Sequence, residues 1–260
     1  SFSHNYRIAK SYGVKIENGE VKISGVFDDW PLFGKNPQNT RSYFGLGIKD
    51  ENNETYWHTE INTDIGGWFK SPVVSNGLVY IASQDYKILA FNLTADSKNK
   101  NDKNQYPVDA SDDKYKVESS VAVENEKVIV ATSELNSSNN KVYALNSLNL
   151  SEELWYFSLD NENTICYSAA PTIANNKVFV TSWSGKFYNN QMFLNIYNKL
   201  NAILNNRLGL NNKLIALNLN TGEKLWDVNL PGGGLSTPAV SDGLVFVGCD
   251  SIMGPTLFAF

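Results

Sequence analysis

The fold is decided by the stretch Ser71-Pro72-Val73-Val74-Ser75-Asn76-Gly77-Leu78-Val79-Tyr80-Ile81-Ala82-Ser83. A short apolar run, a two-residue polar turn and a Val-rich run follow one another in it. The same pattern returns at residues 120–131, 170–181 and 237–248. Alternating short strands around a two-residue turn are the signature of a β-hairpin. We therefore predict four hairpins built on one plan.

The four turns differ in how well they suit this plan. Asn76-Gly77 and Asp242-Gly243 fit a type I′ turn, because both central residues of that turn need positive φ. Asn175-Asn176 can adopt the same turn less readily. Asn125-Glu126 is the poorest match, because Glu gains nothing from positive φ.

Further strands follow each hairpin. A third apolar run lies at residues 87–92, 141–146 and 213–218, each ending in Ala-x-Asn, and a related run lies at 257–260. A fourth strand is marked by a tryptophan, at Trp57, Trp155 or Trp226. The first three copies recur every 49–50 residues. This spacing predicts an all-β protein, a β-propeller of about four to five four-stranded antiparallel blades. A β-sandwich with regular strand spacing is the alternative.

The unit that runs from Asn218 through Thr221-Gly222 to Trp226 resembles the tryptophan-docking repeat of quinoprotein-type (PQQ-like) β-propellers. The segment 29–40, which begins Asp-Trp-Pro-Leu-Phe-Gly, resembles the opening segment of such propellers. The resemblance covers residues 28–260 and implies one propeller domain there. Residues 1–27 form an N-terminal extension, in which 14–23 are predicted to make a separate hairpin with an Asn18-Gly19 turn.

The docking motif has a physical reason of its own. Gly222 makes the tight turn between outer strands, and the indoles of Trp57, Trp155 and Trp226 wedge between neighbouring blades. Trp155 sits in a degraded copy without Thr-Gly. The copy before it has no Trp, and a polar loop from Thr94 to Lys114 stands in the expected place.

Propellers of this family close with more blades than the four hairpins supply. We therefore expect the remaining blades to come from a longer chain or from a second polypeptide, because an open array of strands would aggregate. The third unit also carries an insertion, residues 184–212, with apolar residues at helical spacing. It is predicted to form an amphipathic helix that lies on one propeller face or docks a partner.

The sequence contains no recognisable catalytic set. Its two histidines, His4 and His58, have no triad context. With two separate cysteines they give no zinc spacing. The acidic loops around Asp50 and Asp112 lack the pattern of a calcium loop. Enzymes of the family that use pyrroloquinoline quinone (PQQ) carry a vicinal Cys-Cys pair and an Asp base near calcium, and this chain has no such pair. We therefore predict no catalytic residues, no cofactor and no metal.

The cysteines and the N-glycosylation sequons indicate the cellular compartment of the protein. Cys166 and Cys249 fall at the same end of neighbouring predicted blades, so the geometry allows a disulfide between them. Such a bond requires their Cα atoms to lie within about 7 Å. Two buried free thiols are the alternative. Sequons for N-glycosylation occur at Asn53, Asn92, Asn136 and Asn149. The chain begins with Ser1, so we expect it to have been cut from a precursor. We predict an extracellular, cell-surface or periplasmic protein.

Composition narrows the class of protein further. Of the 260 residues, 42% are hydrophobic and 19% are charged, which suits a packed core. The net charge of −5 argues against a nucleic-acid partner, and no apolar run reaches membrane-spanning length. We predict a non-catalytic scaffold for a protein partner or for self-association. The alternatives are a fragment of a PQQ-dependent dehydrogenase and a self-assembling surface-layer or filament subunit.

Overall fold

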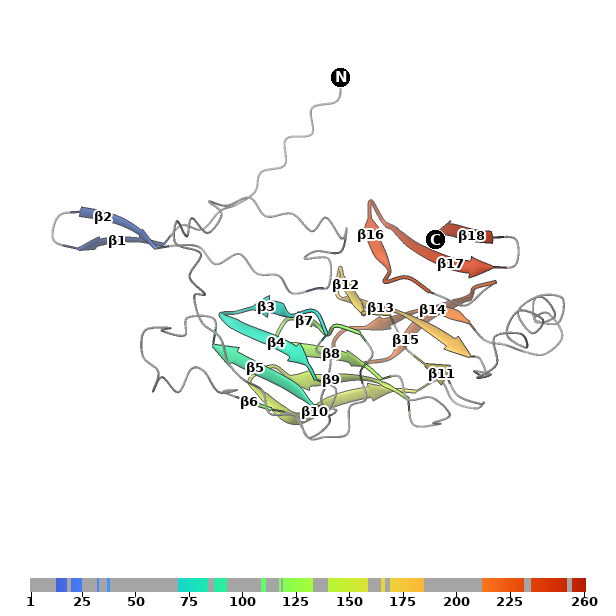
Figure 1. The fold of residues 1–260 in the computed structure, drawn as a ribbon, viewed down its shortest axis with the longest axis horizontal. Coiled ribbons are helices and arrows are strands. Elements are labelled where there is room, and N and C mark those ends of the chain that lie inside the picture. The colour runs from blue at the N-terminus through green and yellow to red at the C-terminus, as the bar shows by residue number, and fades with distance from the viewer. Residues whose placement is uncertain are drawn as a thin grey trace, which may run out of the picture.

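The computed structural model describes residues 13–17, 20–24, 32, 37, 70–83, 87–92, 109–110, 117, 119–132, 140–158, 165–166, 169–184, 212–231, 235–251 and 254–260. Every regular element in these ranges is a β-strand (Figure 1). The first two strands, β1 (Gly13–Glu17) and β2 (Glu20–Ser24), form the predicted N-terminal hairpin. The described residues contain no helix that is long and apolar enough to cross a membrane.

The remaining strands form four antiparallel sheets that follow one another along the chain, and we call them blades one to four (Figure 1). Blade one contains β3 (Val73–Ser75), β4 (Leu78–Ala82), β5 (Ile88–Asn92) and β6 (Asp109–Ala110). Blade two contains β7 (Ala122–Glu124), β8 (Lys127–Ala131), β9 (Val142–Asn146) and β10 (Asn149–Phe157).

Blade three contains β11 (Ile165–Cys166), β12 (Thr172–Ala174), β13 (Lys177–Ser184), β14 (Lys213–Asn218) and β15 (Lys224–Asn229). Two of them, β11 and β12, pair with different parts of β13. Blade four contains β16 (Ala239–Ser241), β17 (Leu244–Ser251) and β18 (Gly254–Ala259). The prediction of an all-β propeller built from antiparallel blades is confirmed.

The short first strands set the arrangement of the blades. Strand β3 contacts β7, β7 contacts β12, and β12 contacts β16. The first strands of successive blades therefore lie side by side, and we call them the inner strands. The other strands of each blade follow outward from its inner strand.

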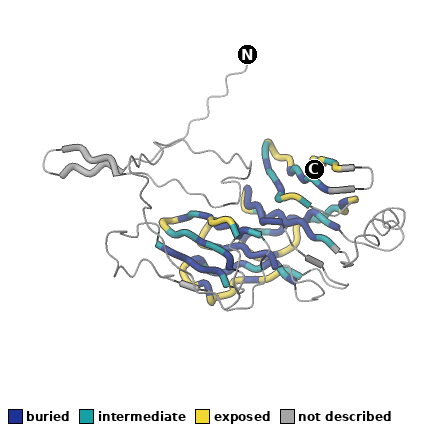
Figure 2. The backbone as a smooth tube through the Cα atoms, viewed as in Figure 1, coloured by how far each residue is buried: buried dark blue, intermediate teal, exposed yellow. Residues whose placement is uncertain are grey.

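The core lies between the blades. Successive residues of a strand point to opposite faces, so each blade can bury both faces against its neighbours. In β8, for example, Val128 and Val130 pack toward blade one, while Ile129 and Ala131 pack toward blade three. We call each packed surface between consecutive blades a seam. Buried residues follow the strands along these seams (Figure 2).

All four hairpin turns have positive φ at both central residues. The φ values are 52° and 76° for Asn76 and Gly77, and 51° and 81° for Asp242 and Gly243. Asn175 and Asn176 have 51° and 60°, and Asn125 and Glu126 have 49° and 60°. The turn with the poorest sequence therefore adopts the same geometry, because the strands on either side of it dictate the turn.

Replacing Glu126 by Gly is expected to stabilise the protein by about 0.5–1 kcal/mol. A non-Gly residue in the left-handed region costs about 1–2 kcal/mol, and the extra freedom of Gly in the unfolded chain returns part of that gain. Glu126 is exposed, so no packing is lost. Urea unfolding measures the change. An E126G variant that is no more stable than the wild type would contradict the argument.

The predicted polar loop 94–114 contains a short strand, β6, so part of that prediction is wrong. The predicted helix at 184–212 falls almost wholly outside the described residues, which stop at Ser184 and resume at Asn212.

Candidate functional site

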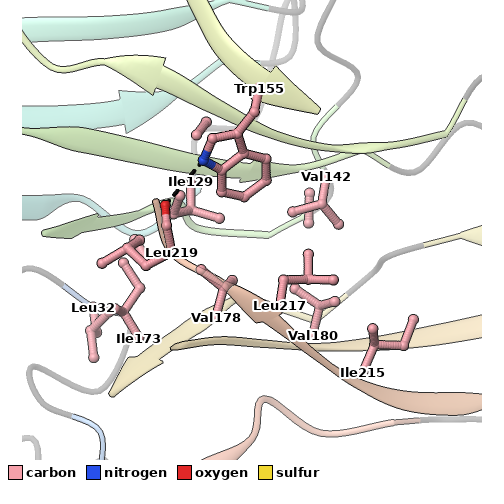
Figure 3. Close-up of a cluster of buried hydrophobic side chains, with 13 residues drawn as sticks. Leu32, Ile129, Val142, Trp155, Ile173, Val178, Val180, Ile215, Leu217 and Leu219 are labelled. Atoms are coloured by element: carbon pink, nitrogen blue, oxygen red, sulfur yellow. Dashed lines mark hydrogen bonds between the residues drawn. The ribbon is translucent and has the colours of Figure 1, made fainter. Parts of the chain in front are cut away.

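The seam between blades two and three is closed by Trp155 on β10. Its indole N–H donates a hydrogen bond of 3.0 Å to the carbonyl of Leu219, in the turn of blade three between β14 and β15. The side chain is only 9% exposed. It packs with buried residues of both blades, among them Ile129 and Leu217 (Figure 3). The tryptophan of one blade thus docks on the turn of the next.

Gly222 is the contact point for this indole. It has a φ of 73°, and a Cβ built on it would lie 2.6 Å from Cε3 and 2.7 Å from Cδ2 of Trp155. Real Cβ atoms do not approach an aromatic ring this closely, so only glycine allows the ring to lie against the backbone here. The glycine of the motif therefore serves both the turn and the seam.

The turn itself is held by the asparagine that ends the third strand. Oδ1 of Asn218 accepts the N–H of Asn220 at 2.8 Å. In blade two, Oδ1 of Asn146 accepts the N–H of Leu148 at 2.9 Å. Such bonds form an Asx turn. The repeated Ala-x-Asn pattern marks this asparagine in the sequence. That its Asx turn supports the seam was not predicted from the sequence.

Blade one lacks the tryptophan, and the structure shows what replaces it. The hydroxyl of Tyr80 on β4 donates a buried hydrogen bond of 3.2 Å to the carbonyl of Ser147. Ser147 corresponds to Leu219, since each directly follows the capping asparagine. The N–H of each also bonds to the second residue of its hairpin turn, Glu126 or Asn176. The carbonyls at these corresponding positions therefore both accept a hydrogen bond, from a phenol at Ser147 and from an indole at Leu219.

The register shows where the missing tryptophan would have been. Trp155 lies opposite Ala144 in blade two, and Trp226 lies opposite Ala216 in blade three. The corresponding Ala90 of blade one lies opposite Asp109. The outer strand of blade one is thus present, but it does not supply the indole. The donor comes from the second strand instead.

Replacing Tyr80 by Phe is expected to cost about 1–3 kcal/mol of stability, because it leaves the buried carbonyl of Ser147 without this donor. Tyr156 offers a matched control, since it is 55% exposed and its hydroxyl is not buried in a seam. Y156F should change stability by less than about 0.5 kcal/mol. Thermal unfolding of both variants measures the difference, and equal effects would remove the proposed role of the Tyr80 hydroxyl.

At the seam between blades three and four, blade three contributes a pair of aromatic rings, Trp226 and Phe179, and a hydrogen bond joins the two blades. The ring of Trp226 on β15 lies 5.9 Å from that of Phe179, tilted by 50°. Trp226 is only partly buried, and it packs against a cluster that includes Val240 and Val247 of blade four. On the inner strands, Oγ1 of Thr172 donates to the carbonyl of Pro238 at 2.6 Å.

One carboxylate in blade three is held between two lysines. Asp227 pairs with Lys213, which lies on the neighbouring strand, and with Lys224 at 2.7 Å. The hydrogen bond from Lys213 is the main cause that lowers the pKa of Asp227, and the bond from Lys224 adds to it. All three side chains are partly solvent-exposed. Through Lys213 the cluster adds one ion pair to the β14–β15 ladder.

The remaining predicted site residues are spread over the chain. Asn149 is exposed at the start of β10, and Asn92 ends β5. Cys249 on β17 is buried, and the disulfide with Cys166 stays a prediction, because the side chain of Cys166 lies outside the described residues. Cys166 itself lies on β11. Three predicted positions fall outside the described residues: Trp57, Asn53 and Asn136. No group of three or more potential metal ligands occurs in the described ranges.

A family model for PQQ-like repeats, described as outer membrane protein assembly factor BamB, matches residues 45–195 and 206–251. These two segments make up well over half of the 260 residues. The chain therefore belongs to this family of PQQ-like β-propeller repeat proteins, as the resemblance implied. No curated protein matches the sequence significantly.

Solved structures share the fold at low sequence identity. The quinohemoprotein alcohol dehydrogenase from Comamonas testosteroni matches with a TM-score of 0.56 and 16% identity, over 85% of this chain and 35% of that one. The quinohemoprotein alcohol dehydrogenase ADHIIG from Pseudomonas putida HK5 matches with a TM-score of 0.59 and 16% identity, over 85% and 34%. The chain thus spans about a third of the length of these proteins. Likeness at this identity shows the shared fold.

Proposed function

We propose that this protein is a non-catalytic, exported β-propeller that acts as a protein-interaction or assembly scaffold. The observation that carries the proposal is how the repeated residues are used. Trp155, Gly222 and the capping Asn218 all meet at one seam, and Tyr80 does the corresponding work at another. Residues that recur through the chain therefore serve the assembly of blades.

Two further observations support the proposal. The matching family model is described as an outer membrane protein assembly factor, which is a role in protein interaction. In addition, Cys166 and Cys249 lie in different blades, so this chain has no vicinal cysteine pair of the kind that family resemblance implies for a quinone site. The exposed sequon at Asn149 fits an exported protein.

The alternative is a piece of a PQQ-dependent dehydrogenase. The fold shared with the two alcohol dehydrogenases favours it, because the same blades can carry either role. In that case the residues that hold the cofactor would lie outside the seams described above.

The test is a titration of the purified full-length protein with PQQ and calcium. The scaffold proposal expects no saturable change in cofactor absorbance and no alcohol-dependent reduction of a dye. Calcium alone serves as the control for non-specific effects of the ion. Saturable PQQ binding together with robust turnover of an alcohol would overturn the scaffold proposal in favour of the dehydrogenase.

A further inference from the structure

We infer that blade four undocks from blade three as a unit, while blades one to three stay packed together. The inference is independent of the scaffold proposal, because the opening depends only on how the seams are closed. The three seams between the described blades differ in how firmly their outer strands are held.

The first two seams are each locked by a buried hydrogen bond away from the inner strands. At the seam between blades one and two, Tyr80 on β4 donates to the carbonyl of Ser147. At the seam between blades two and three, the indole of Trp155 on β10 donates to the carbonyl of Leu219. A donor on the second or fourth strand of one blade thus holds the next blade.

The corresponding tryptophan at the seam between blades three and four makes no such bond. Trp226 on β15 lies opposite an alanine of the third strand, as Trp155 does, but it is only half-buried. Within the described residues its indole N–H has no hydrogen-bond partner. Its ring contact, to Phe179, lies inside blade three. Trp226 therefore packs beside blade four without being bonded to it.

The packing at this last seam is also less complete. Its apolar cluster includes four half-buried side chains, those of Trp226, Val228, Leu235 and Phe258, whereas the cluster between blades two and three includes Phe157. A half-buried side chain loses less on separation, because part of its surface is already in water. Less free energy therefore opposes the separation of blade four than the separation of blade three.

The inner strands supply the pivot for the opening. Strands β12 and β16 contact each other, and Oγ1 of Thr172 donates a buried hydrogen bond of 2.6 Å to the carbonyl of Pro238. This bonded side stays closed while β17 and β18 move away from blade three. Partial openings of proteins involve contiguous units of this kind.

Cys249 on β17 reports on the opening. It is only 3% exposed. It shares a strand face with Val245 and Val247, because alternate residues of a strand point to the same side. Both valines pack in one cluster with Leu214 of blade three. A thiol reagent therefore reaches Cys249 only when blade four moves away from blade three or unfolds.

Undocking also has a consequence for binding. It uncovers apolar side chains on both facing blades, Phe179 and Leu214 in blade three and Val245 and Val247 in blade four. A protein partner for this surface meets it only in the open form, and its binding shifts the equilibrium toward that form. The fold thus controls when this surface is exposed.

The test measures alkylation of Cys249 by iodoacetamide in the reduced 260-residue protein at increasing urea concentrations. After quenching, modification is followed by mass spectrometry of the tryptic peptide that follows Lys224 and contains Cys249. Global unfolding is measured in parallel by circular dichroism. The alkylation rate of the unfolded protein converts each native rate into an open fraction.

Leu214 and Leu217 provide a matched pair of variants. Both lie on β14 and are fully buried, but Leu214 packs at the seam with blade four and Leu217 at the seam with blade two. Leu214→Ala therefore favours the proposed opening, whereas Leu217→Ala removes the same side chain from the neighbouring seam. If either variant does not fold, L214V and L217V replace the pair.

We expect the open fraction in water to exceed the globally unfolded fraction about thirtyfold or more. It should also depend less steeply on urea, because undocking exposes less surface than global unfolding. L214A should raise the open fraction at least about tenfold, and L217A should change it less than about twofold. An open fraction and a urea slope equal to those of global unfolding would overturn the inference. Equal rises in the two variants would do so as well.

Discussion

Replacement of Gly222 by Ala is expected to destabilise the protein by about 2–5 kcal/mol. Two costs add up. A side chain at a φ of 73° carries a conformational penalty of about 1–2 kcal/mol. The new Cβ would also overlap the Trp155 ring at 2.6 Å, and overpacking of this kind costs about 1–3 kcal/mol. The ring cannot move aside cheaply, because it is buried and bonded to Leu219.

The chain offers two matched controls for this variant. Gly77 and Gly243 have φ values of 76° and 81°, and a Cβ at either would meet nothing within 4 Å. G77A and G243A should therefore pay only the conformational penalty. Urea unfolding of the three variants, with slopes compared, isolates the steric cost at the seam. A loss at G222A no larger than at the controls would show that Trp155 does not rest on Gly222.

Replacement of Trp155 by Ala is expected to cost about 3–5 kcal/mol, the usual range for removing a large buried aromatic side chain. Part of the loss arises because the Leu219 carbonyl is left buried without the indole donor. W155F keeps much of the ring and loses the N–H, so it should cost less than W155A. Chemical unfolding measures both variants.

A double-mutant cycle ties the two predictions together. In the W155A background no ring opposes the new methyl group, so G222A should then cost only its conformational penalty of about 1–2 kcal/mol. The loss in the double mutant should therefore be smaller than the sum of the two single losses by about 1–3 kcal/mol. Strictly additive losses would mean that the indole and the glycine act independently, contrary to the contact in the structure.

The hairpins could be predicted from sequence because their signal is local. Alternating Val-rich runs and Asn-Gly or Asp-Gly turns specify strand and turn within a dozen residues, and the structure follows them even at Glu126. The regular spacing of the repeats then predicted that each hairpin belongs to a separate propeller blade. The family resemblance rested on the unit from Asn218 to Trp226, whose glycine indeed lies at a seam.

The remaining features depend on contacts between residues far apart in the sequence. Tyr80 reaches Ser147, 67 residues away, and nothing in its own strand distinguishes it from an ordinary core residue. The strand β6 is only two residues long, too short to show a period inside a polar stretch. Leu32 packs against blades two and three, and the carbonyl of Pro37 bonds to blade four, which all follow much later in the chain. No local pattern encodes such pairings.

The use of two unlike donors for corresponding carbonyls, Ser147 and Leu219, bears on how such rings evolve and avoid misassembly. Because the carbonyl at a seam can accept a hydrogen bond from either a phenol or an indole, the sequence of one blade can diverge while the blade still docks on the next. Divergence in turn protects the chain, because identical tandem units readily exchange with one another during folding and misassemble. The loss of the tryptophan from blade one makes its contact with blade two different from the next seam. This difference favours pairing of each blade with its correct neighbour.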